Sequence, residues 1–190
     1  MRDRYFTDEV SSVLLRSRTS GLTDSPIIFY GASNISRWRT LRGDMMPLPC
    51  LNHGFGGATD IELLHWADRL VGAFSPRAVV VNCSQNDLTA YGDEDILSNK
   101  TRLADKLKNM TDDLLFLSVI KAPCVESQSE RIKRLDEAVG RICRRAGARF
   151  IDISGLFAAD CFEDDAHLNA EGYRRLAAVL RGELRQYIRE

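Results

Sequence analysis

Five short apolar runs divide the chain at fairly regular intervals. Most of them are rich in β-branched or aromatic residues and show no polar alternation, which is typical of strands buried on both faces of a sheet. The second run contains Pro49, whose missing N–H favours an edge strand. The predicted strands are residues 27–31, 48–54, 78–84, 114–120 and 148–154.

Segments with helical periodicity lie between these runs. Each places aliphatic side chains along one stripe, and leucines recur every four positions in the C-terminal segment. Strands that alternate with helices predict βαβ units, a parallel sheet and a doubly wound sandwich. Residues 6–20 predict an additional N-terminal helix, with Thr7 as its cap. The other predicted helices are residues 60–74, 93–111, 127–146 and 176–188.

The whole chain, residues 1–190, is predicted to be a single domain in which residues 1–26 form a helical N-terminal extension. Its length suffices for one substantial core, and no repeat, low-complexity tract or linker interrupts it. A composition of 44% hydrophobic and 28% charged residues is that of a soluble globular protein. The formal net charge of −1 provides no global attraction to nucleic acid, and local arginine clusters are interpreted as solvated helix faces.

Cysteine usage and the N-terminal residues indicate a cytoplasmic protein. The five cysteines are odd in number and lack a C-x-x-C pair, which argues against a disulfide framework and against a zinc site. The first residues carry acids and no apolar core followed by a cleavage site, so no signal peptide is expected. No apolar run approaches the ~20 residues that a membrane-spanning helix needs.

The loops that follow the predicted strands are the candidates for a site, because ligands of doubly wound folds bind beyond the carboxyl ends of the strands. In "FYGASNISRW", Ser33 follows a buried strand and has the small neighbours Gly31 and Ala32. A serine hydroxyl there can act as a nucleophile if a base accepts its proton. The alternative is a helix N-cap, which serine also favours, and the local pattern alone favours the cap.

His167 is the best candidate for the base among the three histidines. It lies in "EDDAHLNAEGY" with Asp164 three residues earlier, a spacing that lets a carboxylate on a turn orient the imidazole. His53 precedes a glycine loop, and His65 lies within a predicted helix whose neighbours look structural. The alternative is a surface loop with solvated acids, in which Asn169 caps the last helix.

Two further loops contain groups that could stabilise an oxyanion. The "NHGFGGATD" loop, residues 52–60, holds three glycines that can bring a backbone N–H close to a bound anion. A phosphate-binding loop and a plain tight turn are its alternatives, although it fits neither the dinucleotide-binding nor the P-loop pattern. Asn86, in "NCSQND", carries a side-chain amide that can donate either to an oxyanion or to its own loop.

In chain order, Ser33, Gly57, Asn86 and His167 match the four blocks for which the SGNH hydrolases, also called GDSL-type esterases and lipases, are named. The chain resembles this family over nearly its whole length. The resemblance implies a flavodoxin-like three-layer α/β/α sandwich with five parallel strands. It also implies a hydrolase without a metal or cofactor, a Ser33–His167–Asp164 triad, and an oxyanion hole of Ser33, Gly57 and Asn86.

Three positions depart from the usual blocks of the family. Ala32 and Ala58 stand where Gly-Asp-Ser and Gly-Asp-Thr carry aspartate, and Ser84 stands where G-x-N-D carries glycine. None of these changes removes a predicted triad or oxyanion group. Since a carboxylate near a developing oxyanion is electrostatically unhelpful, its loss need not abolish activity.

The predicted function is hydrolysis of small acyl or carbohydrate-borne esters, such as O-acetyl esters, through an acyl-enzyme on Ser33. The expected partner is therefore a small-molecule or carbohydrate ester, whereas no nucleic acid and no membrane span are expected. Short loops after the fourth and fifth predicted strands leave little material for a large lid, which disfavours a long-chain lipase. An acyltransferase with the same site and a catalytically weak binding domain are the alternatives, and the oligomeric state is open.

Overall fold

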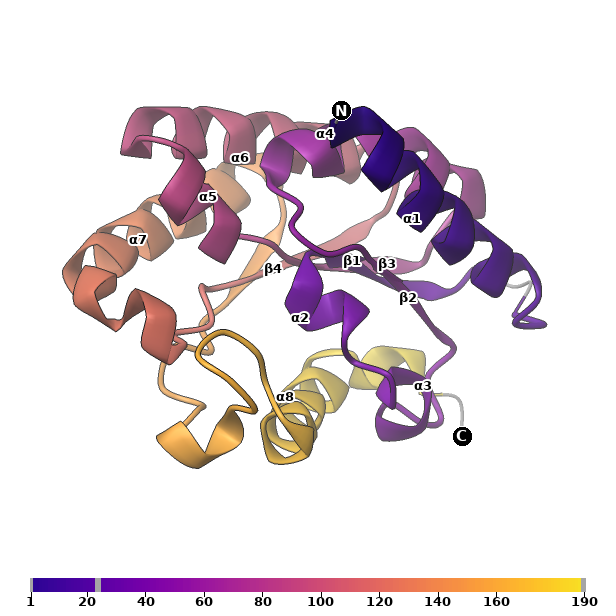
Figure 1. Ribbon diagram of the computed structural model, residues 1–190. Helices are drawn as coiled ribbons and strands as arrows, with labels where there is room; N and C mark the ends of the chain where they lie inside the picture. The colour runs from indigo at the N-terminus through magenta and orange to yellow at the C-terminus, as the bar shows by residue number, and fades with distance from the viewer. Residues whose placement is uncertain (1, 23–24, 189–190) are drawn as a thin grey trace.

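A computed structural model describes residues 2–22 and 25–188 of the chain. Five parallel strands form one sheet in the order β2-β1-β3-β4-β5, which is the flavodoxin-like order (Figure 1). The second strand in the chain lies at an edge of the sheet, as Pro49 predicts, and Pro49 itself directly precedes it. The strands are β1 (Ile27–Gly31), β2 (Cys50–Gly54), β3 (Ala78–Asn82), β4 (Asp113–Leu117) and β5 (Arg149–Ile151).

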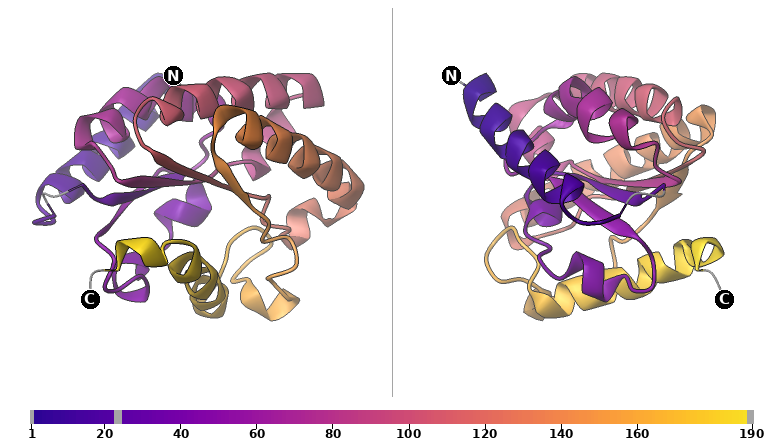
Figure 2. Two further views of the ribbon diagram at one scale, coloured as in Figure 1. Left: turned by 180° about the vertical axis from the view of Figure 1, so that it is seen from behind. Right: turned by 90° about the vertical axis from the view of Figure 1, so that its right-hand side faces the viewer.

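Helices cover both faces of this sheet (Figures 1 and 2). One layer contains α1 (Arg2–Arg18), α4 (Asp60–Leu70), α6 (Asp93–Lys108) and α7 (Ser129–Ala146). The opposite layer contains α2 (Ser33–Ser36), α3 (Leu41–Asp44) and α8 (Ala170–Glu183). The remaining helical segments are α5 (Gln85–Ala90), η1 (Gly72–Phe74), η2 (Pro123–Gln128), η3 (Ala159–Cys161) and η4 (Arg185–Tyr187).

The central strands β1 and β3 are almost entirely apolar because both of their faces are covered. In β1, Ile28 and Tyr30 pack with the layer of α1, α4, α6 and α7, while Ile27 and Phe29 pack with the layer of α2, α3 and α8. Successive strand residues point to opposite faces, so each apolar run contributes to two cores. The predicted three-layer α/β/α sandwich is confirmed.

Some predicted boundaries differ from the observed ones. The N-terminal helix begins at Arg2 rather than near residue 6, so Thr7 lies within α1 and the prediction that it caps this helix is wrong. The regular C-terminal helix ends at Glu183, before the last of the periodic leucines, and a short 3-10 helix follows it. Residues 1, 23 and 24 of the predicted N-terminal extension lie outside the described residues.

The five cysteines are unpaired thiols, of which Cys124 is exposed and the others are buried. Within residues 2–22 and 25–188, no helix combines the length and the apolar character that crossing a membrane requires. The cytoplasmic location stays a prediction.

Parallel register brings the loops after three strands to one edge of the sheet. Gly31, the last residue of β1, is aligned with Gly54 of β2 and with Asn82 of β3. Gly54 has no space for a side chain, because an added Cβ would lie 2.3 Å from the backbone nitrogen of Ser36. This glycine therefore lets α2, the helix that carries Ser33, lie directly against the end of β2.

Candidate active site

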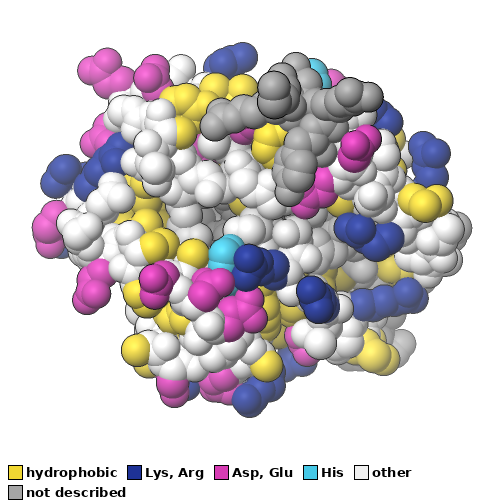
Figure 3. All heavy atoms as spheres, viewed as in Figure 1, with side chains coloured by type: hydrophobic (Ala, Val, Ile, Leu, Met, Phe, Trp, Pro, Cys, Tyr) yellow, Lys and Arg dark blue, Asp and Glu magenta, His cyan; other side chains and the backbone are white. Residues whose placement is uncertain are grey.

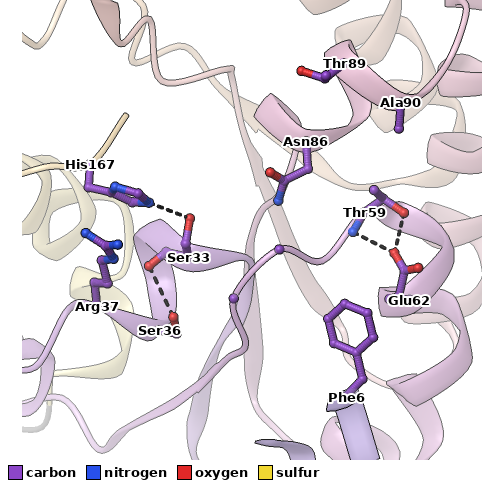
Figure 4. Close-up of a pocket in the computed structure, with 12 residues that line it drawn as sticks. Phe6, Ser33, Ser36, Arg37, Thr59, Glu62, Asn86, Thr89, Ala90 and His167 are labelled. Carbon is purple, nitrogen blue, oxygen red and sulfur yellow. Dashed lines mark hydrogen bonds between the residues drawn. The ribbon is translucent and has the colours of Figure 1, made fainter. Parts of the chain in front are cut away.

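Ser33 is the first residue of α2, one residue beyond the preceding cap position. Ala32 occupies that cap position and makes no side-chain capping hydrogen bond, so the alternative in which Ser33 is an N-cap does not apply. The Ser33 hydroxyl lies instead 3.0 Å from Nε2 of His167, which is far away in the sequence (Figure 4). The backbone N–H of Ser33 belongs to the first turn of the helix, where such groups have no intrahelical acceptor.

Asp164 and His167 form a compact turn between η3 and α8. Nδ1 of His167 lies 2.8 Å from Oδ1 and from Oδ2 of Asp164. The backbone N–H groups of Ala166 and His167 also donate to Oδ1 of Asp164, each at 2.8 Å. The Ala166 N–H and the His167 ring hold the pKa of Asp164 well below its usual range. A charged carboxylate in this position favours the tautomer with hydrogen on Nδ1, which leaves Nε2 to accept from Ser33.

Asn34, next to Ser33, attaches the histidine turn to α2. Its Nδ2 donates to the carbonyl of Ala166 at 3.1 Å, and its Oδ1 accepts from the N–H of Leu168 at 3.1 Å. The backbone on both sides of His167 is therefore bound by one buried amide. Asn169 caps α8 by accepting from two N–H groups, so the predicted cap and the histidine–aspartate pair occur together.

Arg37 lies at the exposed rim of this arrangement. One guanidinium nitrogen, Nη1, lies 3.2 Å from Oδ2 of Asp164 and 2.9 Å from Oε1 of Glu163. The three side chains are each about half exposed, at 46–48%. Sequence patterns did not identify Arg37, because the acids that it contacts lie more than a hundred residues away.

The predicted oxyanion donors lie on the loop after β2 and on α5. Gly57 has a φ of +74°, a conformation that favours glycine. Nδ2 of Asn86 donates to the carbonyl of Ala58 at 2.8 Å, and its second hydrogen leaves it able to donate to a ligand. The N–H of Gly56 donates to Oε1 of Glu9 at 2.7 Å, so the N-terminal helix also holds this loop.

A cavity of about 1150 Å³ brings Ser33, Gly57, Asn86 and His167 together. Ser33 and His167 face it from one side, while Phe6 of α1 and Glu62 of α4 face it from the other (Figure 4). Basic and acidic side chains gather beside a histidine at the rim of a central hollow (Figure 3). The other lining residues are Phe6, Ser36, Arg37, Gly56, Thr59, Glu62, Thr89 and Ala90. Gly56 and Thr59 belong to the glycine loop, residues 52–60, and sequence patterns gave the other six no role.

The other two histidines lie elsewhere. His53 is completely buried in β2, where Nε2 lies 2.7 Å from the Ser17 hydroxyl and Nδ1 lies 2.5 Å from the Leu70 carbonyl oxygen. Burial lowers the pKa of His53 to about 4. His65 is exposed on α4 and lies edge-on to Trp66. Neither ring lines the cavity around Ser33.

The model of the GDSL-like Lipase/Acylhydrolase family matches residues 17–175. A search of curated proteins finds no match. Among solved structures, a Streptococcus pneumonia protein named for platelet activating factor has a TM-score of 0.79 at 16% identity, covering 96% of this chain and 95% of its own. A GDSL-like lipase from Bacteroides thetaiotaomicron has a TM-score of 0.76 at 18% identity, with coverage of 86% and 89%. An acetylxylan esterase from Geobacillus stearothermophilus has a TM-score of 0.67 at 15% identity, with coverage of 85% and 94%.

Proposed function

Because the chain belongs to the GDSL-like lipase/acylhydrolase family, we propose that it is a single-domain serine esterase that hydrolyses small acyl or carbohydrate-borne esters. The observation that carries this proposal is the continuous hydrogen-bonded path from Asp164 through His167 to Ser33, which ends in an open cavity. Nucleophile, base and orienting acid then stand in the order that covalent ester hydrolysis requires.

In the proposed mechanism, Nε2 of His167 accepts the Ser33 proton while Oγ attacks the ester carbonyl carbon. Asp164 stabilises the imidazolium that forms and keeps the ring oriented. The N–H groups of Ser33 and Gly57 and the amide of Asn86 donate to the oxyanion of the tetrahedral intermediate. His167 returns its proton to the leaving alcohol, and a water molecule deprotonated by His167 then releases the acid from Ser33.

The lining of the cavity supports a polar ester. Thr59, Glu62, Thr89 and Arg37 surround the Ser33 region, while Phe6 is the large apolar side chain among the lining residues. The polar side chains of this surface can form hydrogen bonds with the hydroxyl groups of a sugar. The acetylxylan esterase among the structural neighbours agrees with an acetylated carbohydrate as the substrate to test first.

A fluorophosphonate probe and a substrate series test the proposal. We expect the probe to modify Ser33 in the folded protein, and p-nitrophenyl acetate to be hydrolysed in the absence of an acceptor alcohol. The Ser33→Ala variant should lose both reactions. Activity on acetylated xylo-oligosaccharides should exceed activity on p-nitrophenyl esters of long fatty acids.

Each of the other outcomes points to a different function. A folded wild-type protein that the probe does not label at Ser33 would be a binding domain rather than an esterase. Turnover that requires a sugar or alcohol acceptor would indicate an acyltransferase.

A further inference from the structure

A buried ionic cluster of Asp60, Asp87 and Lys100 lies beneath the two segments that carry Gly57 and Asn86. The side chain of Lys100, on α6, is 3% exposed, and that of Asp60 is 0% exposed. Nζ of Lys100 lies 2.8 Å from Oδ1 of Asp60. None of the three side chains lines the cavity, so any effect on the reaction must act through other groups.

Lys100 contacts both the segment that carries Gly57 and the segment that carries Asn86. Asp60 is the first residue of α4 and directly follows the loop that contains Gly57. Nζ of Lys100 also donates to the carbonyl of Cys83 at 2.7 Å, directly after β3 and shortly before Asn86. One ammonium group therefore binds the end of the first segment and the start of the second.

Three further hydrogen bonds join the same segments. Oδ1 of Asp87 accepts a hydrogen bond from the backbone N–H of Asp60 at 3.1 Å, which joins the segment of Asn86 directly to the start of α4. The carbonyl of Ala58 accepts from Nδ2 of Asn86 at 2.8 Å and from Sγ of Cys83 at 3.2 Å. The orientation of the Asn86 amide thus depends on the position of Ala58, which lies two residues before Asp60.

We propose that Lys100 is a positioning residue that sets the spacing between the Gly57 and Asn86 donors of the oxyanion hole. This inference rests on the proposed esterase function. A loss of alignment between two donors is costly in catalysis, because preorganised donors act only at the place where the oxyanion develops. A displacement of about 1 Å can lower a rate about a hundredfold.

The charge of Lys100 suits this role. Burial works against the ammonium charge, but the carboxylates of Asp60 and Asp87 outweigh burial and raise the pKa of Lys100. Potential metal-ligating atoms of Asp60, Cys83 and Asp87 lie within 4.8 Å of one another, an arrangement that could also surround a metal ion. Here the ammonium of Lys100 contacts Asp60 and supplies the positive charge.

Two variants separate positioning from a purely structural role. Lys100→Met removes the ammonium, and Lys100→Met combined with Asp60→Asn also removes the carboxylate that it contacts, so that Asp60 is not left as a buried acid without its partner. We expect kcat for p-nitrophenyl acetate to fall about ten- to a hundredfold in both variants, with KM changed less than about threefold. Thermal unfolding identifies the variants that remain folded at the assay temperature.

An aryl trifluoromethyl ketone provides a second measurement. Its adduct with Ser33 carries an oxyanion, so the inhibition constant should rise by about the same factor by which kcat falls. Arg149→Met is the matched control, because Arg149 makes a half-buried ion pair with Asp113 on the far strands of the sheet. It should change thermal stability without changing kcat.

Each outcome identifies which statement fails. A folded double variant with wild-type kcat and wild-type ketone affinity would overturn the role of Lys100 and leave the esterase intact. A loss of kcat in Arg149→Met equal to that in the Lys100 variants would also overturn it, because any destabilised protein would then behave alike. A wild-type protein without Ser33-dependent turnover would overturn both the esterase and the inference.

Discussion

The candidate site has one half whose carboxylate is exposed and one half that rests on buried charges. We call Ser33, Asp164 and His167 the triad half, and Gly57 and Asn86, with the ionic cluster beneath them, the oxyanion half. The carboxylate of Asp164 is 46% exposed, whereas that of Asp60 is completely buried. Both halves position groups at one cavity, but they do so with different interactions.

The difference lies in what each set of contacts contributes to folding. Asp164 is held by the backbone and ring of its own turn, and its ion pair with Arg37 is open to solvent, where such pairs contribute little. The side chains of Lys100 and Asp60 are almost completely buried, so solvent cannot replace a lost partner and its removal is costly. The triad half should therefore tolerate substitutions that change activity alone, whereas substitutions beneath the oxyanion half should change activity and stability together.

Asp164→Asn should show the largest loss of activity without a matching loss of stability. Asparagine retains an oxygen for the backbone N–H groups, but it no longer selects the hydrogen on Nδ1 of His167, and kcat should fall roughly 10⁴-fold. The melting temperature should stay close to that of the wild type. Steady-state kinetics and thermal unfolding of the same preparation measure the two effects.

Glu163→Gln is the matched control for this change, because the Glu163 side chain contacts the same arginine, whereas its contact with His167 is a backbone hydrogen bond that the substitution leaves in place. Its kcat should stay within a few-fold of the wild type. A large drop in melting temperature for Asp164→Asn would show that the triad half also supports the fold, and the comparison would fail.

Asn86→Ala tests the oxyanion half directly. Loss of one oxyanion donor should lower kcat by roughly 10²–10³. The same change removes the hydrogen bond to the Ala58 carbonyl, so a measurable drop in melting temperature should accompany it. Asn109→Ala is the control, since this amide donates only to a carbonyl within α6 at the surface. Equal kinetic losses in the two variants would rule out the specific role of Asn86.

His53 allows a test of how stability near the oxyanion half depends on pH, because it lies in β2 at the base of the loop that carries Gly57. Burial lowers its pKa from 6.5 to about 4. Well above pH 6.5 the ring is neutral in the folded and unfolded chain alike. As the pH falls from 6.5 to about 4, the unfolded chain binds a proton that the folded chain does not, so folding should lose roughly 3 kcal/mol.

His53→Gln should remove this part of the pH dependence, whatever its absolute stability is. Urea unfolding at several pH values between 4 and 7 measures the slope in each protein. His65→Gln, at an exposed histidine on α4, is the control. An unchanged slope in His53→Gln would assign the acid sensitivity to other groups.

Sequence patterns predicted the fold well because its signals are local. Apolar runs, most of them without polar alternation, predicted all five strands, and Pro49 correctly predicted that the second strand lies at the edge. The N-terminal helix was located but its start was not, because Thr7 has the chemistry of a cap while the backbone is already helical before it. A favoured cap residue marks a helix start only where the preceding chain is not helical.

The same reasoning explains which parts of the site could be predicted. Asp164 and His167 are three residues apart, so their pairing is visible as spacing along the chain. Lys100 contacts Asp60 across 40 residues, and a lysine within an amphipathic helix carries no sign that it is buried. Phe6 lines the cavity from a helix before the first strand, whereas sequence patterns place candidate site residues only in the loops that follow the strands. Long-range pairs of ordinary residues are therefore the part that sequence patterns miss.

Arg37→Gln should have the smallest effect of the four substitutions that test this comparison. It tests whether solvent exposure separates the two halves of the site. Its ion pairs with Asp164 and Glu163 are about half exposed, so kcat should fall about fivefold at most, and the melting temperature should not change. This small effect should shrink further in 0.5 M salt, because the Debye length is then well below about 8 Å.

Arg39→Gln, at a nearby exposed arginine, controls for the general loss of a positive charge. A hundredfold loss specific to Arg37 that persists in high salt would mean that an exposed ion pair controls the triad. Exposure would then no longer separate the two halves, and Arg37 would instead have to contact the substrate in the cavity that it lines.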